Sequence, residues 1–77
     1  MNPNFNIRRV AVAAPHAYVV ASILSPLHFS VSKGSRLGGV RLKSFLKEPN
    51  PGSYTFQIED PKEALKLREG DTVELTS

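Results

Sequence analysis

The chain has 77 residues, enough for one domain with one core, and no cysteine, which excludes disulfides, iron–sulfur clusters and thiolate–zinc sites. Hydrophobic residues at 40% and charged residues at 22% are typical of globular proteins and exclude a disordered or fibrous chain. The net charge is +3. We therefore expect a single domain over residues 1–77, with its core between about residues 5 and 76.

The first third of the chain predicts two strands. Apolar and polar residues alternate through residues 5–12, and the phase of the alternation changes at residues 8–9, which predicts a bulge. A turn at residues 13–16 follows, because its proline holds the preceding residue extended. Residues 18–24 are rich in β-branched and aromatic side chains and favour a strand. A helix over residues 15–24 is the alternative; its β-branched residues and the lack of an N-cap side chain count against it.

The middle of the chain predicts two more strands. In residues 27–32, Leu27, Phe29 and Val31 alternate with polar residues, the pattern of a half-buried strand. A turn at residues 32–36 and a bend at the glycine pair 38–39 come next. The alternation over residues 40–45 predicts a strand in which Val40, Leu42 and Ser44 alternate with Arg41, Lys43 and Phe45; if Val40 and Leu42 face the core, Arg41 and Lys43 share the outer face.

The last third predicts two strands around one helical turn. Pro-Asn-Pro-Gly at residues 49–52 is a strong turn signal before an alternating strand at residues 54–58. Asp60 and the proline after it predict a short helical turn over residues 61–66, and residues 72–76 form the closing strand. The fold class that follows is mainly β: a small closed antiparallel six-stranded barrel, which leaves no sheet edge exposed.

Several short motifs resemble domain II, the β-barrel of elongation factor Tu and other translational GTPases. The opening of that barrel, Ile-x-Asp-Val and later Val-Val-x-Gly, is similar to Ile7, Val10, Val19, Val20 and Ser22, with Arg9 in place of the acid. Its Gly-Val-x-Met-Phe strand is similar to Gly39, Val40, Leu42 and Phe45, and its closing Gly-x-Val turn to Gly70, Thr72 and Val73. The resemblance covers most of the chain and implies a stand-alone barrel that contacts RNA or a ribonucleoprotein.

A second resemblance covers only the last quarter of the chain. Residues 61–63 and 67–75 are similar to the signature of AbrB-type swapped-hairpin DNA-binding proteins, which place about one more helical turn between the two pieces. A DNA-binding dimer of that type is therefore the third hypothesis for function.

Signals for catalysis are missing from the sequence. There is no Gly-x-x-x-x-Gly-Lys-Ser/Thr loop for nucleotide phosphates and no Gly-x-Ser-x-Gly nucleophile elbow. His16 and His28 have no acidic or cysteine neighbour at metal-ligand spacing, and the adjacent acids Glu59 and Asp60 fit a helix cap better than acid–base work. We therefore expect that this protein is not an enzyme and that it has no cofactor, no metal site and no small-molecule substrate.

The charges are distributed unevenly along the chain. Residues 1–47 contain no acid and carry a charge of +7, whereas residues 48–77 carry −4. An acid-free basic stretch attracts phosphate or acidic protein surfaces. The candidate nucleic-acid-binding residues are therefore its seven cations: Arg8, Arg9, Lys33, Arg36, Arg41, Lys43 and Lys47.

Two further features bear on binding. The turn at residues 33–36 combines backbone amides, a hydroxyl and two cations, which is the make-up of a phosphate nest or of a soluble hairpin tip. Among the six Phe and Tyr residues, only Tyr18 and Phe45 have a phase that allows a surface stacking platform, and we expect both in the core.

These observations lead to one functional hypothesis and its main alternative. We expect a non-catalytic binding module for RNA or the ribosome that uses the basic half of the chain; the alternative is a protein-interaction or self-assembly module, such as a dimer. The apolar run after Arg8 and Arg9 resembles a secretory leader, but Pro15 interrupts it and it is too short to span a membrane. We therefore expect a cytoplasmic protein with no membrane contact.

Overall fold

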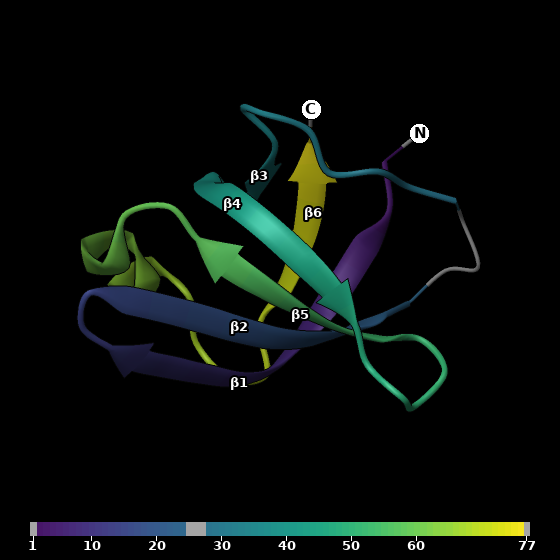
Figure 1. The fold of residues 1–77 in the computed structure, drawn as a ribbon. Helices are drawn as coiled ribbons and strands as arrows, with labels where there is room; N and C mark the ends of the chain where they lie inside the picture. The colour runs from purple at the N-terminus through teal and green to yellow at the C-terminus, as the bar shows by residue number, and fades with distance from the viewer. Residues whose placement is uncertain (1, 25–27, 77) are drawn as a thin grey trace.

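Six antiparallel strands form a closed barrel in the computed structural model, which describes residues 2–24 and 28–76 (Figure 1). Their order around the barrel is β1-β2-β5-β4-β3-β6, with β6 closing the ring against β1. The strands are β1 (Asn4–Ala13), β2 (His16–Ile23), β3 (Arg36–Leu37), β4 (Val40–Lys47), β5 (Ser53–Ile58) and β6 (Thr72–Thr76). The mainly β fold class predicted from the sequence is confirmed.

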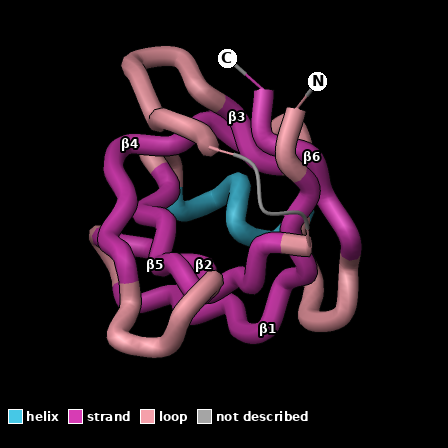
Figure 2. Tube along the Cα trace, turned by 90° about the vertical axis from the view of Figure 1, so that its right-hand side faces the viewer, coloured by secondary structure: helices cyan, strands magenta, loops and turns pink. Residues whose placement is uncertain are grey.

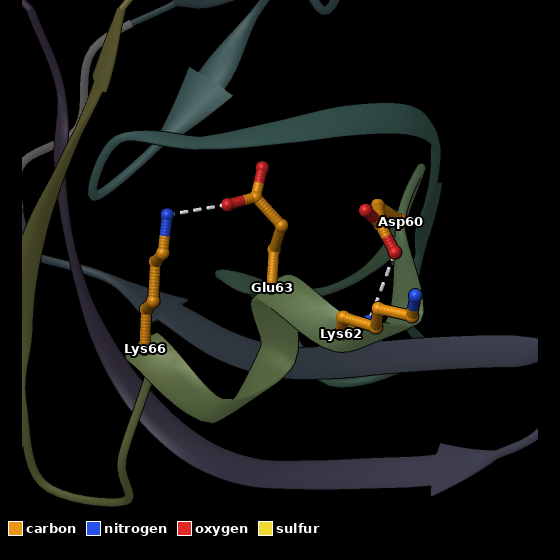
Figure 3. Close-up of polar contacts among 4 residues, drawn as sticks. All are labelled: Asp60, Lys62, Glu63 and Lys66. Atoms are coloured by element: carbon orange, nitrogen blue, oxygen red, sulfur yellow. Dashed lines mark hydrogen bonds and ion pairs between the residues drawn. The ribbon is translucent and has the colours of Figure 1, made fainter.

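One short 3₁₀ helix, η1 (Pro61–Lys66), covers one end of the barrel (Figure 2). It begins as the sequence predicts: the Asp60 side chain accepts a hydrogen bond from the Lys62 backbone N–H at 3.0 Å, and proline occupies the first turn (Figure 3). Ala64 is the residue of η1 that enters the core.

The barrel interior is filled by the inward side chains of all six strands and the chain after η1. An aromatic group occupies its centre: the Phe5 ring packs edge-on against Phe29 and Phe56, each with ring centroids 5.2 Å away, and against Tyr54 at 6.1 Å. The fully buried apolar residues are Phe5, Ile7, Ala17, Val19, Ala21, Leu37, Val40, Leu42, Phe56, Ile58, Ala64, Leu67 and Leu75.

The bulge expected in the first strand is present. Ile7 lies opposite Ala21, whereas Arg9 lies opposite Val20, so Arg8 is the extra residue. The strand predicted over residues 18–24 is confirmed as β2, and the alternative helix is wrong, because the β-branched residues alternate between the barrel interior and its outer wall.

The strand predicted over residues 27–32 is wrong. Residues 28–32 form no strand, and Leu27 lies outside the described residues. The strand between β4 and β6 is instead the two-residue β3, which begins at the last residue of the predicted turn at residues 32–36 and ends before the glycine pair 38–39. Phe29 and Val31 still pack against the core. Alternation therefore identified which side chains are buried, but burial alone does not require that the backbone pairs with a neighbouring strand.

A second correction concerns β4. Leu42 lies opposite Ile58, but Ser44 lies opposite Gln57, so Lys43 is an extra residue at a bulge. The alternation therefore changes phase after Leu42. Ser44 is exposed and its hydroxyl donates to the Gln57 side-chain oxygen at 3.2 Å, and Phe45 lies opposite the buried Phe56.

The tight turn between β3 and β4 generates a prediction about two neighbouring glycines. Both have positive φ, +60° at Gly38 and +84° at Gly39, but a Cβ on Gly38 would lie 2.9 Å from Val73 Cγ1, whereas Gly39 faces open space. Gly39→Ala should cost about 1 kcal/mol of unfolding free energy from the left-handed backbone alone. Gly38→Ala should cost at least about 1 kcal/mol more because of the overlap with Val73. Urea unfolding measures both, and equal losses would contradict the close packing of this turn.

Candidate nucleic-acid interface

A groove of about 590 Å³ lies between the segment before β3 and the first half of β4. Three of the seven candidate cations line it: Lys33 from one wall, and Arg41 and Lys43 from the other. The remaining lining residues are Val31, Ser32, Gly34, Leu42, Ser44, Phe45 and Glu59. Cations that the sequence separates by eight to ten positions thus share one surface feature.

The groove exists because β3 is much shorter than β4. Only Val40 and Arg41 of β4 pair with β3, so the rest of this edge of β4 has no strand beside it. The chain before β3 runs along this edge instead, and one backbone hydrogen bond, from Leu42 N–H to the Ser35 carbonyl at 2.9 Å, joins the two. Beyond that bond the groove lies between the two walls, lined by the side chains of both.

One carboxylate lies in the groove. Glu59 Oε2 is 3.8 Å from Arg41 Nε, and both side chains are about half exposed, so the pair is weak and screened by salt. Among the residues that the structure describes, Lys33 and Lys43 have no carboxylate within ion-pair distance. The groove therefore has a net positive charge, and two of its cations are available to an anionic ligand.

Arg36 lies beside the groove but in a different electrostatic setting. It lines a neighbouring hollow of about 370 Å³ with Arg41 and Lys66, and with three carboxylates: Glu59, Asp60 and Glu63. Figure 3 shows two of these carboxylates engaged, Asp60 at the start of η1 and Glu63 with Lys66. Positive and negative groups balance here, so Arg36 contributes less to a basic surface than Lys33 or Lys43 does.

The other three candidate cations lie elsewhere. Arg8 and Arg9 are on β1, which two strands separate from β4 in either direction around the barrel, and Arg8 Nη1 donates to the Ser22 hydroxyl at 3.3 Å. Lys47 is at the far end of β4, in a third hollow of about 320 Å³. The seven cations therefore do not form one continuous patch, and the groove unites three of them.

In the turn at residues 33–36, whose composition fits a phosphate nest or a soluble hairpin tip, the serine forms hydrogen bonds within the turn. The Ser35 hydroxyl is buried (1% exposed) and accepts a hydrogen bond from the Ser32 backbone N–H at 2.9 Å. The Ser35 backbone N–H donates to the Ser32 carbonyl at 3.0 Å. This hydroxyl holds the turn together rather than facing a ligand, so the turn presents the Lys33 side chain and not a serine-based nest.

Tyr18 and Phe45, the two aromatic residues that we expected in the core, are both exposed. Tyr18 is 36% exposed on the outer wall, and Phe45 is 38% exposed at the end of the groove. Phe45 is the site residue that sequence reasoning placed wrongly. The bulge at Lys43 places Phe45 opposite Phe56, and the two rings are 6.2 Å apart, but the other side of the Phe45 ring stays exposed.

Other kinds of site find no support in the residues that the structure describes. Within residues 2–24 and 28–76, no three His, Asp or Glu side chains lie close enough to hold a metal ion. No helix in the same ranges is long and apolar enough to cross a membrane. Comparisons with protein families, with curated proteins and with solved structures found no match to this chain.

The internal hydrogen bonds of the turn predict the effect of Ser35→Ala. Loss of the hydroxyl leaves the partly buried Ser32 N–H without its acceptor and should lower the unfolding free energy by about 1 kcal/mol. Because this hydroxyl does not face the groove, affinity for an anionic ligand should be unchanged at a temperature where the variant is folded. Thermal unfolding and heparin affinity chromatography measure the two effects. Unchanged stability with lost retention would show instead that Ser35 contacts the ligand.

Proposed function

We propose that the chain is a non-catalytic module that binds RNA, alone or within a ribonucleoprotein such as the ribosome, by holding the phosphate backbone in the groove of Lys33, Arg41 and Lys43. The observation that carries the proposal is the convergence of these three cations on one groove that contains a single carboxylate. A phosphate backbone fits such a groove, because each bound phosphate releases condensed counterions and gains a Lys or Arg contact.

The groove is suited to binding RNA without distinguishing its base sequence. The cations come from a strand and an adjoining turn, and phosphate contacts of this kind set position and orientation but do not distinguish bases. The resemblance to domain II of the translational GTPases supports an RNA partner independently of the charges. We place this activity in the cytoplasm, where ribosomes and other ribonucleoproteins are found.

Two matched double variants test which face of the barrel binds. Lys33→Gln with Lys43→Gln and Arg8→Gln with Arg9→Gln each lower the net charge from +3 to +1, but on different sides of the barrel. Binding of a labelled RNA oligonucleotide is measured by fluorescence anisotropy as a function of salt. The Lys33 and Lys43 variant should lower the slope of log affinity against log salt by about 1.4, two single-strand phosphate contacts at about 0.7 each.

The variant at Arg8 and Arg9 is the control and should keep the wild-type slope. Equal losses in both variants would mean that overall charge, and not the groove, attracts the RNA. Wild-type protein that does not bind, or whose binding is insensitive to salt between about 50 and 200 mM, would refute the proposal.

One observation favours a second candidate, self-association. Leu46 is 67% exposed and, with Tyr18, lines an apolar hollow of about 290 Å³ on the outer wall of β2, β5 and β4. A second copy of the chain would cover this surface. This alternative predicts a stable dimer in light scattering that Leu46→Glu dissociates, and no retention on heparin. A monomer at all concentrations would exclude it.

A further inference from the structure

Phe45 lines three surface hollows, and two of them also contain lysine or arginine side chains. Its ring lines the groove that contains Lys33, Arg41 and Lys43. It also lines the hollow of about 320 Å³ at the far end of β4, together with His28, Phe29, Lys47 and Tyr54. A ligand that extends from one hollow to the other must therefore pass over this ring, which is 38% exposed.

The Phe45 ring is supported by contacts with three other aromatic rings. Its centroid lies 5.6 Å from Phe29, 6.2 Å from Tyr54 and 6.2 Å from Phe56, to which it is nearly parallel at an interplanar angle of 29°. Phe29 and Phe56 in turn pack on the buried Phe5. The exposed side of Phe45 is therefore a fixed apolar surface supported by the core, and a ligand loses little side-chain entropy by packing on it.

Cations flank this surface along the strand. Lys43 precedes Phe45 by two residues and Lys47 follows it by two, and both side chains are exposed. Lys43 belongs to the groove on one side of the ring, and Lys47 to the hollow on the other, which no carboxylate of the described residues lines. An aromatic ring between two cations complements a nucleotide whose base stacks while its neighbouring phosphates contact the cations.

Building on the proposed function, we propose that the groove takes single-stranded RNA and that one unpaired base stacks on Phe45. A paired base in a helix has both faces covered by its neighbours, so it cannot lie on the ring. A duplex can use only the cations. The aromatic ring thus gives the site a preference for unpaired RNA that phosphate contacts alone do not provide.

The test compares three single variants on two RNA probes, a single strand and a fully paired duplex without loops or overhangs that carries the same charge. Phe45→Leu keeps most of the apolar volume but removes the stacking surface, and Phe45→Trp keeps a ring and introduces the only tryptophan of the chain. Leu46→Ala is the matched control, because Leu46 is the next residue and is exposed, but it shares only the apolar hollow of the outer wall with Phe45 and lines neither the groove nor the hollow at Lys47. Circular dichroism and thermal unfolding establish that each variant is folded.

The inference predicts that wild-type protein binds the single strand more tightly than the duplex, and that Phe45→Leu weakens single-strand binding about tenfold without affecting duplex binding. Leu46→Ala should bind as the wild type does. Phe45→Trp should retain single-strand affinity, and the stacked base should quench its indole fluorescence.

Two other outcomes would overturn the inference in distinguishable ways. If Phe45→Leu binds the single strand as tightly as wild type while the Lys33 and Lys43 variant loses affinity, RNA binds through the groove without stacking. Only the role of Phe45 is then refuted. If wild-type protein binds neither probe, the proposed function fails together with the inference.

Discussion

The length of β3 is the constraint on which both the fold and the candidate site depend. Two residues, Arg36 and Leu37, are enough to pair with β4 on one side and β6 on the other and so close the barrel. They are too few to cover the edge of β4, which continues for six residues past this pairing. The uncovered edge becomes one wall of the basic groove, so closure of the core and exposure of the site have the same cause.

Contacts between aromatic rings connect the core of the barrel to the surface at the groove. Phe5 is fully buried, Phe29 and Tyr54 are half-buried and Phe45 is exposed, and each ring contacts the next. The rings form a continuous path from the centre of the barrel to the proposed stacking surface. Direct ring contacts therefore link the packing around Phe5 to the position of Phe45.

Folding redistributes the charges that the sequence separates into a basic and an acidic part. The acidic residues after β5 lie next to Arg36 and Arg41, where Glu59, Asp60 and Glu63 offset the positive charge. They do not reach Lys33 and Lys43. Three of the seven cations of the first 47 residues thus line the groove, and the acidic residues of η1 and the end of β5 offset the positive charge beside it.

The sequence by itself determined the fold class, most strands, the turns and the start of η1, because these depend on local features: the alternation of apolar residues, the backbone restrictions of proline and glycine, and the Asp60 cap. Only the tertiary structure decided that β3 rather than residues 28–32 joins the barrel, and that the bulge at Lys43 turns Phe45 to an uncovered edge. Alternation shows which side chains face inward, but pairing and register depend on distant segments that close the ring. For the same reason the sequence could name seven cations, but only the closed barrel brings Lys33 beside Lys43 and leaves Arg8 and Arg9 apart.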